Sequence, residues 1–207
     1  MKHLRVLFIA TSILATVAFA EESARPKGQG LSNPDISANF LGLGRTQLSN
    51  ERHSFENGWR LQEAELQFTS NVDPYLRAVA LVSIAQENGE WGIDPEEVYA
   101  ETISLPSVTF KFGKFKAAVG RHNLLHTHAY PFIDAPLINQ QLLGEEGLND
   151  VGASASVMLP LSWYSEVIAQ MINAQNPEIF GSPKPGQVAG IVHLKNLWDL
   201  SDASTLE

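Results

Sequence analysis

The stretch Leu76-Arg77-Ala78-Val79-Ala80-Leu81-Val82-Ser83-Ile84 carries an apolar side chain at every second position. Successive side chains of a β-strand point to opposite faces of a sheet, so this spacing predicts a strand with one apolar face. Residues 59–70 repeat the pattern. Their apolar positions are Ala64, Leu66 and Phe68, and the intervening polar positions are Glu63, Glu65 and Gln67. Both stretches predict a sheet that is apolar on one face and polar on the other.

Eight segments of the chain carry this β-strand character. They are 35–43, 59–70, 75–86, 96–105, 108–119, 150–159, 163–173 and 188–196. Strands of soluble domains are usually ~5–6 residues long, whereas a tilted strand that crosses a bilayer needs ~9–11 residues. The predicted lengths favour an all-β, antiparallel transmembrane β-barrel, although alternation by itself also fits a soluble sandwich.

The predicted connections alternate between short and long. The short ones are 71–74, 106–107 and 160–162, and the long ones are 44–58, 87–95, 120–149 and 174–187. Outer-membrane barrels have short periplasmic turns and long extracellular loops, which this order matches. Aromatic residues lie beside the short turns, namely Tyr75, Trp163, Tyr164 and Trp198. We expect them to form an interfacial girdle, with ordinary core aromatics at strand ends as the alternative.

The first twenty residues predict a secretory signal peptide. Lys2, His3 and Arg5 precede an apolar stretch from Val6 to Ala18, and Ala18-Phe19-Ala20 fits an A-x-A cleavage site. A membrane anchor would need ~20 apolar residues, more than this stretch offers. We therefore expect a cleaved signal peptide at 1–20, a flexible periplasmic lead-in at 21–34 and a barrel domain at 35–207.

Composition excludes several other classes of protein. The 207 residues include no cysteine, so disulfides and thiolate metal sites are excluded. The formal net charge is −9 at pH 7, which argues against a nucleic-acid partner. No G-x-S-x-G, H-E-x-x-H or phosphate-loop motif is present in the sequence, and we predict no catalytic residues and no enzymatic activity.

The segment Gly113-Lys114-Phe115-Lys116-Ala117-Ala118-Val119-Gly120-Arg121 closes one predicted strand and opens the longest connection. With Pro131-Phe132-Ile133-Asp134 and Val151-Gly152-Ala153-Ser154-Ala155-Ser156, it resembles bacterial outer-membrane porins of the phosphate-selective O and P type. The resemblance implies a barrel in the outer membrane of a Gram-negative bacterium, in contact with its lipid. It also implies passage of small solutes or ions, and a homo-trimer as one assembly.

Further segments are similar to proteobacterial outer-membrane proteins that are often labelled zinc-regulated TonB-dependent receptors. These segments are 61–66, 70–75, 126–129 and 143–148. A TonB-dependent receptor carries a plug of about 100–150 residues within its barrel. Here the predicted strands begin near Asp35, which disfavours that mechanism.

The end of the sequence predicts that further strands follow. Residues 204–207 read as the first residues of a ninth strand, without the terminal aromatic residue that is typical of the family's last strand. The porin-like relatives have ~16–18 strands, the size at which a barrel encloses a channel. We therefore expect an N-terminal fragment with about eight strands of a larger barrel.

Basic residues near the outer end of one predicted strand are the candidate pore residues. They are Lys111, Lys114, Lys116 and Arg121, together with Arg77. In a narrow pore such charges favour anions. In the alternative, acidic residues on the polar faces neutralise them across the lumen, namely Glu63, Glu65, Glu97, Glu101 and Glu166.

The long connection 120–149 also contains the spacing H-x3-H-x-H, formed by His122, His126 and His128. Neutral imidazoles suit zinc, and three of them can form an open site with water in the fourth position. In the alternative, these histidines are donors that hold the loop against the barrel wall.

Three functions follow from the sequence. We predict a porin-like channel for passive or facilitated passage of small solutes, with anions as one candidate class. The alternatives are a zinc-associated outer-membrane receptor or uptake protein, and a soluble exported β-domain that acts as a binding module.

Overall fold

The computed structural model describes residues 33–46, 58–87, 90–132, 135–144, 147–182 and 184–207. The predicted signal peptide and most of the predicted lead-in lie outside these residues. Each of the eight predicted strands is present, and a ninth short strand follows them.

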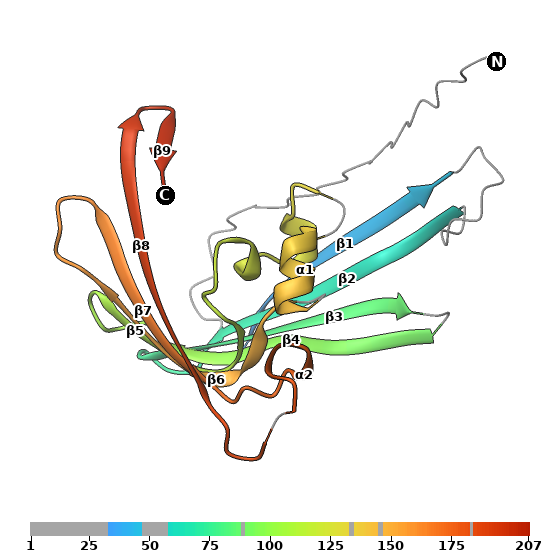
Figure 1. Ribbon diagram of the computed structural model, residues 1–207, viewed down its shortest axis with the longest axis horizontal. Coiled ribbons are helices and arrows are strands. Elements are labelled where there is room, and N and C mark those ends of the chain that lie inside the picture. The colour runs from blue at the N-terminus through green and yellow to red at the C-terminus, as the bar shows by residue number, and fades with distance from the viewer. Residues whose placement is uncertain (1–32, 47–57, 88–89, 133–134, 145–146, 183) are drawn as a thin grey trace.

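Nine strands form one antiparallel sheet in chain order (Figure 1). They are β1 (Asp35–Arg45), β2 (Gly58–Asn71), β3 (Leu76–Glu87), β4 (Glu90–Thr102), β5 (Val108–Lys116), β6 (Asn149–Met158), β7 (Tyr164–Ile172), β8 (Ala189–Ser201) and β9 (Ser204–Leu206). The sheet is curved but open, because β1 and β9 form its two edges and pair only with β2 and β8. The prediction of an all-β, antiparallel chain is confirmed, and the described strands do not close into a barrel.

Helical segments occur only in the connections of the described chain. They are the 3-10 turns η1 (His122–Leu124) and η2 (Thr127–Ala129), and the helices α1 (Leu137–Leu143) and α2 (Pro177–Phe180). Within the described residues, no helix is long and apolar enough to cross a membrane.

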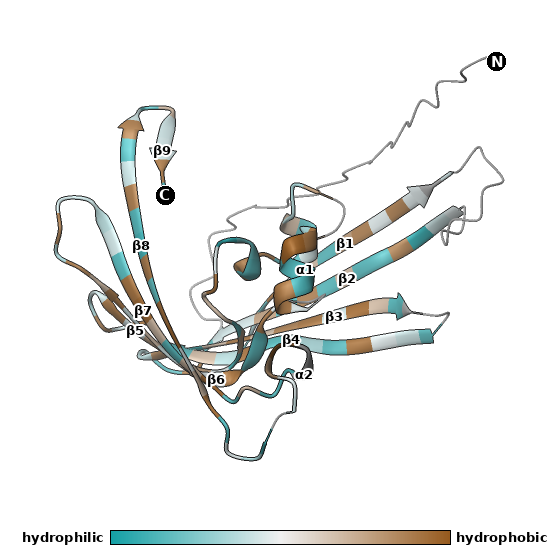
Figure 2. Cartoon of the chain, viewed as in Figure 1, coloured by the Kyte–Doolittle hydropathy of each residue, from teal (hydrophilic) through white to brown (hydrophobic). Residues whose placement is uncertain are grey.

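Strand register divides the sheet into two chemically different faces, and Figure 2 shows hydrophilic and hydrophobic residues alternating along the strands. One row of paired residues runs Ala78, Ala100, Phe112, Ala153 and Met171 across β3 to β7. The opposite face carries the row Arg77, Glu101, Lys111, Ser154 and Gln170. The alternation predicted from the sequence therefore holds across neighbouring strands and not only along each one.

One predicted connection is wrong. Residues 87–95 were expected to form a long loop, but β3 ends at Glu87 and β4 begins at Glu90. The dipeptide Asn88-Gly89 that separates them is a strong signal for a tight hairpin. The alternation that would reveal the start of β4 is interrupted near Pro95, where the register of β4 against β3 shifts by one residue.

The β5–β6 loop is defined as residues 117–148 and includes α1, and its described residues fold over the polar, concave side of the sheet (Figure 1). A small apolar core forms beneath it, and its buried members are Phe115, Ala117, Leu148 and Ile172. Leu143 at the end of α1 and Phe180 at the end of α2 pack against this core. These contacts hold both helical connections against the same side of the sheet.

Two paired glycines allow close backbone approach beneath this core. Gly113 of β5 pairs with Gly152 of β6. A Cβ atom on Gly113 would collide with the carbonyl oxygen of Val98, and one on Gly152 would collide with that of Met171. Gly113 also has φ of 134°, a conformation that L-residues rarely adopt.

Substitution of Gly113 by alanine should therefore destabilise the sheet. The added Cβ would force β4 and β5 apart, and the strained backbone should cost ~1–3 kcal/mol. Urea unfolding followed by circular dichroism measures this loss as a lower midpoint. Gly190→Ala is the matched control, because nothing lies within 4 Å of a Cβ at that position. Equal midpoints for the two variants would contradict the close approach.

Candidate functional site

The two ends of the β5–β6 loop are joined by one buried amide side chain. Asn123 Nδ2 donates to the carbonyl oxygens of Ala117 at 2.7 Å and Leu148 at 3.0 Å. The backbone N–H of Leu148 donates to Asn123 Oδ1 at 2.7 Å. Asn123 thereby satisfies backbone groups at both ends of the loop and fixes where the residues that follow it meet the sheet.

His126 lies between two carboxylates of β4. Its Nδ1 is 2.7 Å from Glu96 Oε2, and its Nε2 is 2.8 Å from Glu97 Oε1. All three side chains are largely buried, with exposures of 13–16%. This arrangement, here called the His126 clamp, ties the loop to the wall of the sheet through both ring nitrogens.

A β-bulge explains how two consecutive glutamates reach one ring. Leu81 pairs with Glu97, whereas Val82 pairs with Pro95, so Glu96 is the extra residue of β4. In a regular strand, consecutive side chains would point to opposite faces. A bulge re-aims the extra side chain, and proline is tolerated there because the ladder is already disrupted.

His128 contacts a second strand. Its Nδ1 lies 2.7 Å from Glu65 Oε2 of β2. The rings of His126 and His128 stack with centroids 6.2 Å apart and an interplanar angle of 4°. The two histidines therefore connect the loop to β4 and to β2 at one location on the concave face.

The cluster is rich in negative charge. Glu63 and Glu65 are buried on β2, beside the His126 clamp. Lys116 is also buried, but its Nζ donates to the carbonyl oxygen of Leu125 at 3.0 Å. Four carboxylates, Glu63, Glu65, Glu96 and Glu97, thus face two histidines and one lysine.

The electrostatic environment raises the pKa values of both His126 and His128. Burial lowers the pKa of His126, but the hydrogen bonds to Glu96 and Glu97 outweigh burial and raise the pKa to about 9. The Glu65 carboxylate raises the pKa of His128 above its ordinary value. His126 is therefore a cation at neutral pH in the protein as described.

The three predicted metal-binding histidines do not converge on one point. His122 lies beside Tyr130, with ring centroids 6.5 Å apart, and its buried Nδ1 has no hydrogen-bond partner among the described residues. A different set meets instead: Glu65, Glu96 and His126 each place one ligand atom within 4.8 Å of the others.

Two of the five predicted pore residues, Lys111 and Arg77, lie on the polar face of the sheet. Lys111 lies on the polar face, with Nζ 4.0 Å from the centroid of the Tyr99 ring. Arg77 forms an ion pair with Glu101 on the same face. These two residues, from β5 and β3, are the predicted pore bases that strand register assigns to the polar face.

The other three predicted pore bases lie in different surroundings. Lys114 pairs in register with Val98 and Val151 of the apolar face, and its Nζ donates to the carbonyl oxygen of Pro95 at 2.7 Å. Arg121 is exposed, and its Nη1 lies 3.3 Å from Glu207 Oε2. Lys116 supports the loop beside the cluster, as described above.

Glu96 is the member of the cluster that the sequence reasoning missed. The alternation in the sequence places Glu65 and Glu97 on polar faces, but it predicts for them only that they neutralise the basic residues of the pore. The available signal was Pro95, because a proline within a run of strand character marks a bulge or an edge. Neither this signal nor the histidine spacing indicates that the loop meets β2 and β4.

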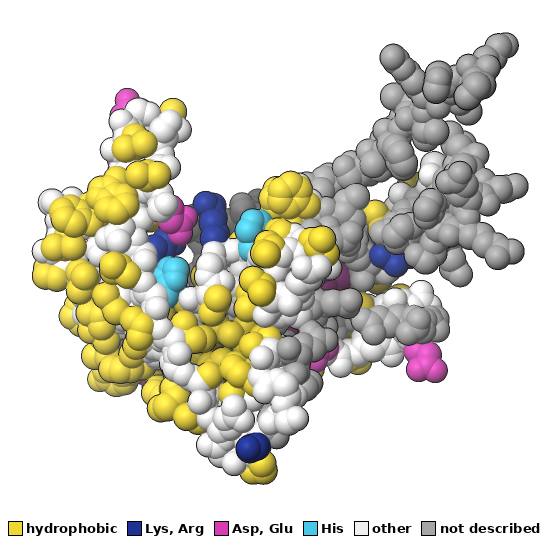
Figure 3. Space-filling model, viewed as in Figure 1, with side chains coloured by type: hydrophobic (Ala, Val, Ile, Leu, Met, Phe, Trp, Pro, Cys, Tyr) yellow, Lys and Arg dark blue, Asp and Glu magenta, His cyan; other side chains and the backbone are white. Residues whose placement is uncertain are grey.

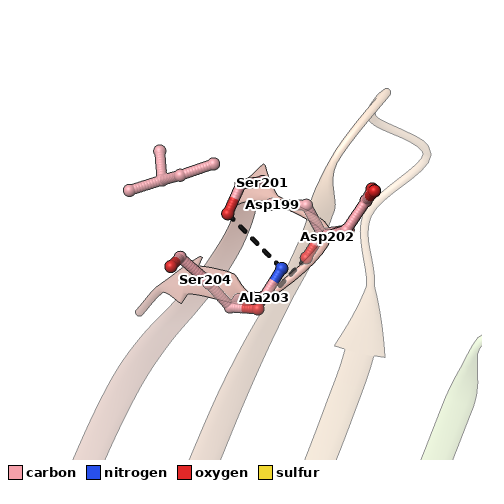
Figure 4. A pocket seen from close by; sticks show the side chains of 7 residues that line it. Asp199, Ser201, Asp202, Ala203 and Ser204 are labelled. Atoms are coloured by element: carbon pink, nitrogen blue, oxygen red, sulfur yellow. Dashed lines mark hydrogen bonds between the residues drawn. The ribbon is translucent and has the colours of Figure 1, made fainter.

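A separate hollow lies at the turn between β8 and β9 (Figure 4). It is lined by residues 199–205, and the backbone N–H of Ala203 donates to Ser201 Oγ at 3.4 Å. Its walls come from one turn rather than from separate elements, so we propose no binding or catalytic role for it.

The raised pKa of His126 predicts a pH dependence of loop docking. A folded-state pKa of about 9 lies above the ordinary value of 6.5, so the proton stabilises the docked loop. This contribution is fully present below pH 6.5 and is lost as pH rises through about 9. An NMR titration of the imidazoles, with His126→Gln to assign the signal, should give a midpoint near pH 9. A midpoint at the ordinary value would show that the His126 clamp is not formed.

Removal of the clamp should release the loop while leaving the sheet intact. Loss of one partner from a buried ion pair costs ~3–5 kcal/mol. In His126→Gln we therefore expect amides of residues 122–130 to exchange more than ~100-fold faster, as measured by hydrogen–deuterium exchange. His122→Gln is the control, since His122 Nδ1 has no hydrogen-bond partner within the described chain. Equal protection of the loop in both variants would argue against the clamp.

Comparisons with known proteins show a similarity to a bacterial protein. No family model and no solved structure matches the chain. A protein of Aquifex aeolicus (strain VF5), described as an uncharacterized protein, is 31% identical over 166 residues, which correspond to 73% of this chain and 34% of that protein. The chain thus spans about a third of the length of this relative.

Proposed function

We propose that the chain is part of a porin-like β-barrel of the bacterial outer membrane that admits small hydrophilic solutes, anions among them. One observation carries the proposal. The long sheet is apolar on its exposed face and polar on the concave face, over which the described part of the β5–β6 loop lies (Figure 1). A lipid-facing wall and a water-facing lumen require this division of residues.

The apolar face supports a lipid environment. Many large apolar side chains on it are exposed, including Phe40, Ile93, Phe112, Met171 and Val192 with exposures of 55–78%. Figure 3 shows hydrophobic side chains over much of the flank formed by β5 to β8. Soluble monomers rarely expose contiguous apolar patches larger than a few hundred Å². This feature disfavours the alternative of a soluble exported binding module.

Strand length and aromatic placement fit the same proposal. Strands β1 to β8 contain 9–14 residues, enough for a tilted crossing of a bilayer. Trp163 and Trp198 lie together at the short-turn end, with ring centroids 6.4 Å apart, and Tyr75 is exposed at that end. Trp59 and Trp91 are exposed near the opposite end, at the starts of β2 and β4. Aromatic residues at both ends of the strands are typical of interfacial girdles.

The open edges of the sheet support a barrel with more strands than the nine described. A sheet that lies in lipid must satisfy the backbone groups of its edge strands, which β1 and β9 leave open. Small barrels are filled by their own side chains, whereas ~16–18 strands enclose a channel. We therefore propose that further strands complete the barrel, and that the β5–β6 loop narrows its lumen.

Conductance across a planar lipid bilayer tests the proposal. The intact gene product should form ion-conducting pores. Lys111→Glu should shift the reversal potential toward cations, because it reverses a charge on the polar face beside Tyr99. Lys184→Glu is the matched control, since Lys184 is exposed in the β7–β8 connection outside the sheet.

Two outcomes would contradict parts of this proposal. Recovery of the protein in the soluble periplasmic fraction would exclude a membrane barrel. The parent protein and Lys111→Glu could instead form conducting pores of identical selectivity. That result would exclude a role of Lys111 in selectivity and would leave the barrel proposal intact.

A further inference from the structure

One carboxylate in the cluster under the β5–β6 loop lacks a well-formed hydrogen bond. Glu65 is only 2% exposed, and neither of its carboxylate oxygens accepts a hydrogen bond of normal geometry from the residues that the structure describes. Its Oε2 has the close contact with His128 Nδ1, and its Oε1 has no donor in the described chain. A buried carboxylate is costly unless a cation or several donors compensate it. His128 therefore compensates Glu65 at Oε2 only, and a bound cation would take the place of the donor that the buried Oε1 lacks among the described residues.

The surrounding donors are close enough to converge on one metal ion. One carboxylate oxygen each from Glu65 and Glu96 and one nitrogen of His126 lie within 4.8 Å of one another. Around a tetrahedral zinc ion with bonds of ~2.1 Å, neighbouring ligand atoms are ~3.4 Å apart. Small side-chain adjustments, on the order of 1 Å, bring the three atoms to that separation.

The remaining neighbours would orient these ligands. The His126 nitrogen that faces Glu96 is Nδ1, while Nε2 is held by Glu97 at 2.8 Å. Metal-binding histidines commonly donate their other ring N–H to a carboxylate, which fixes the tautomer and the ring orientation. His128 would support Glu65 in the same manner through the contact at Oε2.

We propose that Glu65, Glu96 and His126 bind a divalent transition-metal ion of the zinc type at the junction of the β5–β6 loop with β2 and β4. The ion replaces the proton on His126 Nδ1, which is released to solvent, and water completes the coordination. The mixture of imidazole and carboxylate donors suits zinc better than magnesium or calcium, which prefer oxygen ligands. The bound ion links the loop to two strands at once. This set differs from the histidine triad that the sequence predicts, and it requires no pore activity.

Isothermal titration of the intact protein with ZnCl₂, and separately with MgCl₂, tests the site. We expect one zinc ion per chain and at least about tenfold weaker binding of magnesium. Glu65→Gln and Glu96→Gln each remove a ligand and keep the shape of the side chain, so each should weaken zinc binding more than ~100-fold. Glu97→Gln should weaken it ~10–100-fold, as expected for a residue that orients a ligand. His122→Gln is the matched control and should bind zinc as the parent does.

X-ray absorption spectroscopy of the zinc-loaded parent protein provides a second measurement that does not depend on the folding of any variant. We expect oxygen and nitrogen ligands with a single imidazole. Two or more imidazoles, or loss of binding in His122→Gln with retention in Glu65→Gln, would overturn the proposed ligand set in favour of the histidine triad. An absence of zinc binding by the parent protein would overturn the site altogether. Because these readouts do not involve conductance, failure of the site and failure of the proposed channel are distinguishable.

Discussion

Antiparallel register from β1 to β9 is the constraint on which the other features of this protein depend. Pairing aligns the alternating side chains of each strand with those of its neighbours, so single residues become continuous rows. A shift of one residue in one strand would move its apolar side chains to the polar face. Gly113 and Gly152 pair with each other where a Cβ atom on either residue would collide with the backbone of the next strand.

The candidate site occurs where this regular register is broken. The bulge at Glu96 adds one residue to β4, and as a result two consecutive glutamates reach the same imidazole. The Asn123 hydrogen bonds and the small core around Phe115 bring the loop to that position. The sheet thus supplies the carboxylates, the loop supplies the histidines, and neither forms the cluster alone.

The same cluster connects the two proposals. In the proposed channel, a loop that is held on the polar face would narrow the space available to solutes, and a metal ion could join the charged groups that attach the loop. Lys111 and Arg77 lie on that polar face, so the proposed lumen carries both signs of charge. Selectivity would then depend on local placement rather than on the net charge of the chain.

The sequence by itself determined the strands and the division of their faces, because a period of two is a local property of consecutive residues. It also located the ends of most strands, where short turns and aromatic residues interrupt the alternation. The tight β3–β4 connection had a local signal in Asn88-Gly89, which the interrupted alternation near Pro95 obscured. Only the tertiary structure decided the bulge at Glu96 and the partners of His126. The spacing H-x3-H-x-H grouped His122 with the other two histidines, but in the fold His122 lies beside Tyr130 and Glu65 takes its place near His126. Contacts between residues distant in the chain depend on how the loop packs against the sheet, and no local pattern encodes that packing.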